Sequence, residues 1–430
     1  MIGRPAKRRA VLVRPVATLY SSFLAGLTDK MPPKDQVQPS IINTPQPIST
    51  IRLVLPLLAL FAIYALFVFS TLNGFFFLLQ NSIANRKLPD CDEPLRTNYT
   101  GIGYLDYVLT NLGPVWPAIS GNSPGMSVYL LGLLGPVGAA WVLLNLEGWR
   151  RGNAGKLVAF PSVFGILAQT ITYALAVPVY CTWHLYTSRT ATRPDARSVG
   201  IPSAMAFMLP LIIAVGYIVP SAAMFLPAPS IVSVGTKQAL AAAWQPFPIY
   251  TSVLASLCWL FSSYFSPDSD KSGPVTLRGL RRTYAFALSC AVIPRIAAWA
   301  LSLTALAFPT LFPENVAAEI HPLRVFVNRL LWLSPLVQVT SVGEGALWFL
   351  QWDDLIGSTA LLLWALALYK AAHQQASVEI RWTELGSKVV LLSMIIGPVG
   401  AAVVLMRERD ELVFENASRR GESGHDRKTQ

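Results

Sequence analysis

This sequence contains few charged residues. Only 13% of its 430 residues are Asp, Glu, Lys or Arg, about half the share found in ordinary soluble proteins. Residues 53–85 contain no charged side chain, and several later stretches are almost as apolar. A helix needs roughly 20 apolar residues to cross the hydrocarbon layer of a membrane. The composition therefore excludes a large soluble domain and indicates a membrane protein.

The residue patterns that bind metal ions are also missing. The four cysteines form no CxxC pair, and His184, His321 and His373 lack the spacing of zinc ligands. No DDxxD motif is present to hold magnesium on a prenyl diphosphate, and Asp353-Asp354 is followed by residues that do not complete one. The sequence thus predicts no metal site and no cofactor, and it disfavours the ionisation of a diphosphate.

The apolar runs predict an all-α fold, a polytopic bundle of about eight transmembrane helices. The predicted spans are residues 53–72, 127–146, 157–180, 204–226, 247–265, 283–312, 355–369 with the preceding turn, and 389–405.

Three regions follow from this pattern. They are a polar basic arm at residues 1–50, the transmembrane domain at residues 51–405, and a basic disordered tail at residues 406–430. Residues 1–30 are either a presequence or an upstream extension of the gene model. We favour the extension, because residues 31–50 already read as a complete short polar arm.

The net charge of +11 comes largely from the two ends of the chain. Basic residues gather on the cytoplasmic side of membrane proteins, so both termini are expected there. Orientation in a bilayer explains the charge more simply than nucleic-acid binding does. The acidic connection after the first span contains the sequon Asn98-Tyr99-Thr100 and is expected to face the lumen of the endoplasmic reticulum, with Asn98 as a glycosylation site.

Four acidic residues near the predicted spans are candidates for proton transfer: Asp106, Glu147, Asp353 and Asp354. Two adjacent carboxylates resist double ionisation, so one of Asp353 and Asp354 is expected to keep its proton and serve as a general acid. The structural alternatives stay open. Glu147 would pair with an arginine three or four residues on, the two aspartates would cap a helix starting at Leu355, and Asp106 would be a solvated loop residue.

Aromatic and basic residues supply further candidates for substrate binding. Trp348 and Trp352 are four residues apart and are expected to share a helix face, where their rings would stabilise a cation. The alternative is an aromatic belt at the lipid surface. Arg295 interrupts a long apolar run. It either extends to the membrane surface or holds an anionic group inside the bundle.

Three segments resemble the fungal membrane-bound terpene cyclases of ascofuranone and macrophorin biosynthesis. They are YTGIGYLD at residues 99–106, GAAWVLLNLEGWRRGN at residues 138–153 and FLQWDDLIGSTALLLWA at residues 349–365. The resemblance implies a class II-like, metal-independent cyclase that protonates the terminal alkene or epoxide of a prenylated aromatic or quinoid substrate. The DxDD acid motif of soluble class II cyclases is incomplete here, because only QWDD stands at Gln351 to Asp354.

The resemblance therefore points to Asp353, Asp354, Glu147 and Asp106 as candidates for the proton donor and a supporting acid. A lipid-soluble substrate and the surrounding membrane lipids are the expected partners. The alternative function is a multispanning transporter for a small metabolite. It is disfavoured because the chain has few polar groups within its spans and no internal repeat.

Overall fold

The computed structural model describes residues 50–89, 93–115, 123–265, 273–329 and 337–426. The predicted basic arm at residues 1–50 lies outside these residues except for Thr50, which begins the first helix. In the described part of the chain the fold is all helical, as the sequence predicts. The helices are α2 (Thr50–Ala62), α3 (Phe69–Leu72), α4 (Phe75–Ala84), α5 (Gly103–Leu112), α6 (Pro124–Gly148), α7 (Pro161–Thr170), α8 (Tyr173–Thr187), α9 (Arg189–Thr192), α10 (Ala196–Val199), α11 (Ser203–Ile213), α12 (Val219–Met224), α13 (Val234–Trp244), α14 (Phe247–Phe265), α15 (Gly273–Ala307), α16 (Glu314–Glu319), α17 (Pro322–Phe326), α18 (Val342–Ala376) and α19 (Trp382–Asp426).

Six helical stretches among the described residues are long and apolar enough to cross a membrane. They are Thr50–Leu72, Pro124–Gly148, Ala196–Met224, Leu277–Ala307, Val342–Ala376 and Trp382–Arg419. The sequence predicts about eight. The predicted span 247–265 forms α14 with the same bounds, and its part Phe247–Ser262 is one of the shorter apolar helices. The predicted span 157–180 is divided between α7 and α8.

The outer surfaces of several long helices carry large apolar side chains. Leu60 on α2 is 62% exposed, Ile293 on α15 is 65% exposed and Met394 on α19 is 74% exposed. Exposed apolar residues on helices of this length are the surface that lipid tails would cover. The length of the helices and the chemistry of their outer faces together identify a membrane protein.

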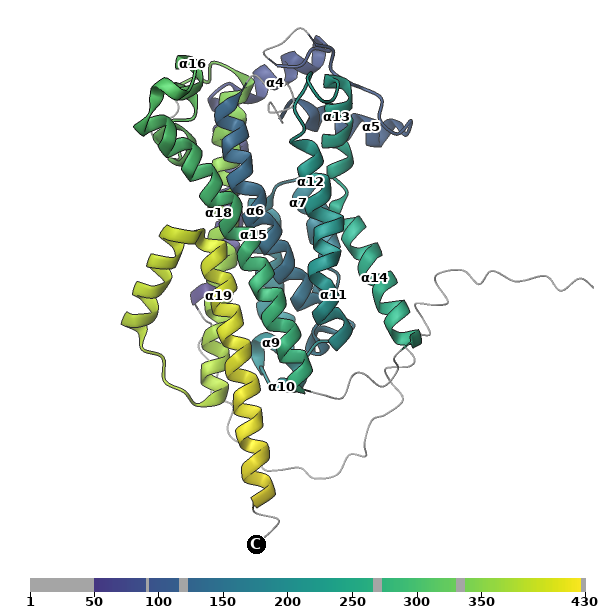
Figure 1. The fold of residues 1–430 in the computed structure, drawn as a ribbon, viewed down its shortest axis with the longest axis vertical. Coiled ribbons are helices and arrows are strands. Elements are labelled where there is room, and N and C mark those ends of the chain that lie inside the picture. The colour runs from purple at the N-terminus through teal and green to yellow at the C-terminus, as the bar shows by residue number, and fades with distance from the viewer. Residues whose placement is uncertain (1–49, 90–92, 116–122, 266–272, 330–336, 427–430) are drawn as a thin grey trace, which may run out of the picture. The chain divides into compact units, whose positions relative to one another are not determined.

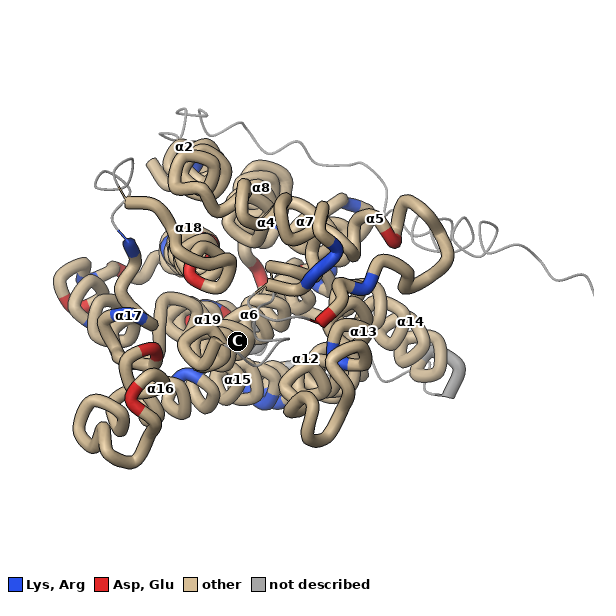
Figure 2. Tube along the Cα trace, turned by 90° about the horizontal axis from the view of Figure 1, so that it is seen from above, with Lys and Arg blue, Asp and Glu red and all other residues tan. Residues whose placement is uncertain are grey.

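Helix α6 is the central helix of this bundle. It is apolar all round and most of its residues are buried, which is typical of a helix enclosed by others. Viewed along the helices, α6 lies among α7, α8, α12, α15 and α18 (Figure 2). Small residues allow the close packing, since a Cβ atom added at Gly135 would lie 2.3 Å from the carbonyl oxygen of Cys290 on α15.

Helices α6, α8 and α18 run in the same direction. Near their N-terminal ends, the Tyr129 hydroxyl on α6 donates to the Leu350 carbonyl on α18. Further along, the Trp364 indole on α18 donates to His184 on α8. The ends of the bundle differ, because α4, α5, α13 and α16 gather at one end and α9 and α10 at the other (Figure 1). The three parallel helices connect the two ends.

Helix α19 extends well beyond the last predicted span. It continues to Asp426, through residues that the sequence assigns to a disordered tail. A non-helical residue, Gly397 with φ 83°, interrupts it just before Pro398. The half-buried Arg295 fills the space beside this kink, where a Cβ atom on Gly397 would lie 2.9 Å from Nη1 of the arginine. Arg295 therefore lies against the backbone of α19, and its role as an anion-binding residue stays a prediction.

Candidate active site

A helix break inside an apolar run lies beside an apolar cavity. Helix α7 ends at Thr170, and Thr172 has an extended backbone with φ −178°. The Thr172 hydroxyl accepts a hydrogen bond from the Leu175 N–H at 3.2 Å and so caps α8. The two short helices pack against each other.

The cavity has a volume of about 170 Å³ and lies between α6, α7, α8, α14 and α18. Its wall is mainly apolar and aromatic, which suits a hydrophobic ligand. The lining residues are Leu112, Val115, Leu133, Leu134, Val137, Ala140, Trp141, Leu144, Phe164, Gly165, Ala168, Gln169, Thr170, Ile171, Thr172, Tyr173, Ala176, Val177, Trp244, Gln245, Phe247, Phe349, Leu350 and Asp353.

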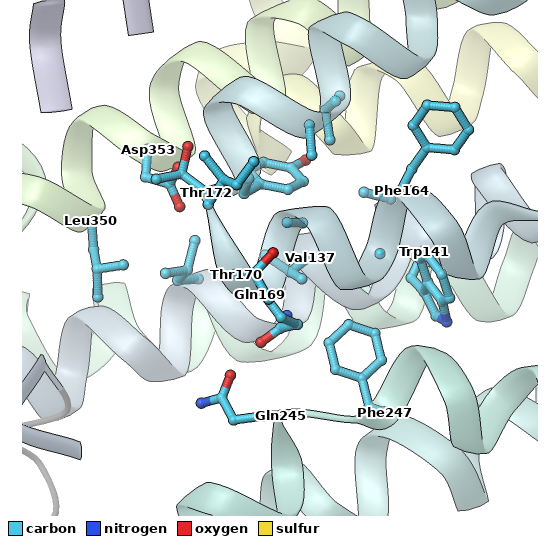
Figure 3. A pocket seen from close by; sticks show the side chains of 18 of the residues that line it. Val137, Trp141, Phe164, Gln169, Thr170, Thr172, Gln245, Phe247, Leu350 and Asp353 are labelled. Atoms are coloured by element: carbon cyan, nitrogen blue, oxygen red, sulfur yellow. The ribbon is translucent and has the colours of Figure 1, made fainter. Parts of the chain in front are cut away.

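Asp353 is the one acidic side chain among these lining residues. It lies at one end of the cavity beside Thr172, and the rings of Trp141 and Phe247 lie at the other end (Figure 3). Its side chain is 8% exposed, and its Oδ1 atom accepts the N–H of Ala174 at 2.7 Å. Asp353 therefore binds the first turn of α8, whose unpaired N–H groups and positive dipole end favour a carboxylate.

Asp354 lies in a different environment from Asp353. It does not line the cavity, and its Oδ1 atom accepts the Ser358 hydroxyl at 2.6 Å. Successive residues on a helix point about 100° apart, so the two carboxylates diverge. Neither caps a helix at Leu355, because α18 begins at Val342 and its N-cap is Ser341. That alternative is wrong.

Trp348 and Trp352 share one face of α18, as predicted, but that face packs against the first helices of the chain. Trp348 stacks on Phe69 at 6.3 Å between ring centroids, and Trp352 meets Phe61 edge to face at 5.9 Å. The Trp352 indole donates to the Arg329 carbonyl at 2.9 Å. Neither tryptophan lines the cavity. Their role in substrate binding stays a prediction.

Glu147 lies in a fully buried charge cluster at the other end of α6. Its Oε1 atom accepts Arg150 Nε at 2.5 Å and Arg409 Nη2 at 2.8 Å. Asp410 completes the cluster, with contacts of 2.8 Å to both arginines. All four residues are at most 1% exposed. We call these four residues the charge cluster; they hold two positive and two negative charges in contact.

Neutral side chains surround the charge cluster. His184 and Thr190 both bind Oε2 of Glu147, at 3.1 and 2.9 Å. The Trp364 indole donates to Nδ1 of His184, which places the imidazole proton on Nε2, where it can donate to Glu147. The Tyr284 hydroxyl donates to Asp410 at 2.7 Å. Glu147 is thus already saturated with partners, and a role as proton donor to a substrate stays a prediction.

Asp106 organises the loop before α5. Its carboxylate accepts the N–H groups of Tyr99, Thr100 and Gly101 at 3.1, 2.7 and 3.0 Å, and also the Thr100 hydroxyl. The Thr100 N–H, followed by the other bonds of this set, holds the pKa of Asp106 below its ordinary value. Asp106 does not line the cavity. The nearby Asn98 has an exposed side chain, and its glycosylation stays a prediction.

Several cavity residues were not found from the sequence. The aromatic rings of Trp141, Phe164, Trp244 and Phe247 come from four different elements, so no spacing along the chain reveals them. Two amides, Gln169 and Gln245, also line the cavity. One signal was available: a threonine inside an apolar run, Thr172, is a typical N-cap and marks the start of α8.

Comparisons with known proteins identify the family. A family defined by the CtvD domain matches residues 51–414. The terpene cyclase ctvD of Aspergillus terreus is 36% identical over 84% of this chain and 97% of its own length. The terpene cyclase penA of Penicillium crustosum is 30% identical over 83% of this chain and 94% of its own.

A third relative, the terpene cyclase ascI of Acremonium egyptiacum, is 30% identical over 87% of this chain and 94% of its own length. No solved structure matches the chain. These relatives support an enzyme with a cyclase role in fungal secondary metabolism, and the resemblance seen in the sequence is confirmed. With the family domain matched across all but the two ends of the sequence, the chain belongs to the CtvD-domain family of fungal terpene cyclases.

Proposed function

We propose that the protein cyclises a prenylated aromatic or quinoid substrate by protonating the terminal alkene or epoxide of its prenyl chain, without loss of diphosphate. One observation carries this proposal. Asp353 is the acidic side chain that lines the apolar cavity, among the residues that the structure describes. A carboxyl group enclosed by apolar walls is favoured in its neutral form, which is the form that can donate a proton.

Hydrogen bonds hold the Asp353 carboxyl at the start of α8. Oδ1 accepts the Ala174 N–H at 2.7 Å, and the Tyr173 N–H and the Thr172 hydroxyl also bond to this carboxyl group. When the proton moves to the substrate, the aspartate becomes negatively charged. The N–H of Ala174 and the positive end of the α8 dipole then stabilise the new carboxylate. Asp353 is therefore held in an environment that supports both of its charge states.

The aromatic residues of the cavity can stabilise the cation that protonation creates. A cation over the face of a tryptophan, tyrosine or phenylalanine ring is attracted by the ring quadrupole, and such rings reach the cavity from α6, α7, α8, α14 and α18. Exclusion of water prevents early quenching of the cation. Loss of one proton after ring closure returns the charge to zero, so the product is an isomer with the mass of the substrate.

The membrane setting fits this chemistry. A substrate with a prenyl chain dissolves in lipid, and an enzyme whose spans face lipid can receive it there. We place the protein in the endoplasmic reticulum as a multi-pass membrane protein, with membrane lipids around it. The transporter alternative gains no support from the comparisons, because the relatives are terpene cyclases.

The test compares two neighbouring acids. Membranes containing the protein are incubated with a farnesylated phenol and with its terminal epoxide, and products of unchanged mass are separated by chromatography. Asp353→Asn removes the proton donor and is expected to lower cyclisation by a factor of about 10²–10⁴. Asp354→Asn is the matched control, since its side chain does not line the cavity. Cyclisation that persists in Asp353→Asn contradicts the proposal.

A further inference from the structure

Two side-chain amides in the cavity take no part in the proton transfer. Gln169 is in the last turn of α7, and Gln245 follows the last residue of α13. Both line the cavity. Their amides point toward one another in the space between Asp353 at one end and the rings of Trp141 and Phe247 at the other (Figure 3). They are polar groups in a wall that is otherwise mainly apolar.

The other buried glutamines of the described chain form hydrogen bonds through their amides, although Oε1 of Gln351 has no partner. Gln238 accepts the Arg96 N–H at 2.8 Å, and Gln351 donates to two backbone carbonyls. Gln245 is 7% exposed. Its side chain has no hydrogen-bond partner among the described residues, and the same is true of the half-buried Gln169. Neither amide is among the fully buried polar atoms that lack a partner, so both face the open space of the cavity and are available to a ligand.

We infer that Gln169 and Gln245 bind a neutral oxygen atom on the head ring of the substrate and thereby position its prenyl chain. This inference rests on the proposed function. A carboxamide has both N–H donors and a carbonyl acceptor, so the pair matches a phenolic hydroxyl or a quinone carbonyl. No lysine or arginine lines the cavity within the described part of the chain, so a carboxylate head would be buried without a counter-charge.

Fixing the head has a consequence for the reaction. The amides and the Asp353 carboxyl lie in one cavity, so a head held by the amides confines the reactive end of the same molecule to the space around the acid. Confinement of this kind replaces a random encounter by an oriented one. Gln169 and Gln245 are then positioning and specificity-determining residues, and Asp353 is the catalytic residue.

The test measures binding, without turnover, on full-length protein in lipid nanodiscs. Two radiolabelled probes with the same prenyl chain are compared: farnesylhydroquinone, which has two neutral oxygens on its ring, and farnesylbenzene, which has none. One hydrogen bond to the head predicts that the wild-type protein binds farnesylhydroquinone about tenfold more tightly. A third probe, farnesylhydroquinone with a carboxylate on the ring, is expected to bind more weakly than the neutral one.

The variant Gln245→Met keeps the length of the side chain and removes the amide, so most of the preference for farnesylhydroquinone is expected to be lost. Gln169→Met is the second variant, used also if Gln245→Met fails to fold. Gln375→Met, at an exposed position of α18, is the matched control and should keep the preference. Equal affinity of the wild-type protein for the first two probes, or a preference that survives in both cavity variants, overturns the inference.

This failure is distinguishable from failure of the proposed function. Probe binding is measured without product formation, whereas the role of Asp353 is tested by measuring the amount of cyclised product. Asp353→Asn is accordingly expected to bind farnesylhydroquinone within about threefold of the wild-type affinity, because the head does not contact the acid. If no probe is cyclised while the amide-dependent preference is present, the assigned reaction is wrong and the assigned recognition stands.

Discussion

Replacing Glu147 with Gln removes one charge from a cluster that protein encloses on all sides. The wild-type cluster balances Arg150 and Arg409 against Glu147 and Asp410, all at most 1% exposed. In Glu147→Gln two positive charges face one negative charge. Removing one partner of a buried ion pair costs about 3–5 kcal/mol, because the remaining charge stays buried without compensation. Since whole domains are stable by about 5–15 kcal/mol, the loss should be large.

A second substitution separates charge balance from other effects. In the double variant Glu147→Gln with Arg409→Gln, one arginine and one aspartate remain, and Arg150 still contacts Asp410 at 2.8 Å. We expect this variant to recover part of the stability lost in Glu147→Gln. The measurement is the free energy of unfolding in mixed detergent micelles, taken for both single variants and the double variant as a double-mutant cycle.

The matched control is Glu411→Gln, on the same helix as Arg409. Glu411 pairs with Arg281 at 3.0 Å and with Arg407 at 3.1 Å, but its side chain is 24% exposed. Partly exposed pairs contribute about 0–1 kcal/mol, so this variant should unfold close to the wild type. Two results would refute the reasoning: Glu147→Gln as stable as Glu411→Gln, or a double variant less stable than both single variants.

The folded double variant also tests catalysis, because retained cyclisation excludes Glu147 as the donor.

Three further predictions concern Asp106, Trp352 and Phe247. The pKa of Asp106 is lowered from 3.8 in the fold, so its stabilisation of the preceding loop is complete above that ordinary value and is lost as the pH falls through the lower folded value. Proteolysis of this loop should therefore increase in acid in the wild type, whereas Asp106→Asn should be cleaved readily at every pH. Trp352→Leu should lower the unfolding free energy by about 2 kcal/mol and leave the products unchanged. Phe247→Leu should alter the ratio of products, as measured by chromatography.

The sequence predicts the helices well because their signal is local. An apolar run of about 20 residues is visible without any knowledge of its neighbours, and the predicted spans at 53–72 and 127–146 correspond to Thr50–Leu72 and Pro124–Gly148. The same local reasoning finds Asp353 as a candidate acid. It places the start of α18 too late, since the predicted span begins one turn before Leu355 whereas the helix begins at Val342. The intervening residues, VGEGALWFLQWDD, contain acids, glycines and aromatic residues that hide the helix.

The cavity and the charge cluster could not be predicted, because both depend on contacts between distant segments. Arg409 is 262 residues away from Glu147 and reads in the sequence as one of many basic residues near the C-terminus. In the same way, no pattern along the chain brings Gln169 to Gln245. The direction in which Trp348 and Trp352 face follows from the packing of α18 on the first helices. Helical periodicity predicts that two residues share a face, but it does not predict which segment packs against that face.

The cavity and the charge cluster are connected through three parallel helices. Helices α6, α8 and α18 each contribute residues to the cavity wall, and each also contributes to the cluster or its shell, through Glu147, His184 and Trp364. Two hydrogen bonds join α8 to α18, one between Ala174 and Asp353 and one between His184 and Trp364. Their residues are ten apart on α8 and eleven apart on α18. At 1.5 Å per residue these separations are about 15 and 17 Å. A sliding of α8 against α18 would break the Trp364–His184 bond and the Asp353–Ala174 bond together, so the two contacts hold one common register between these helices.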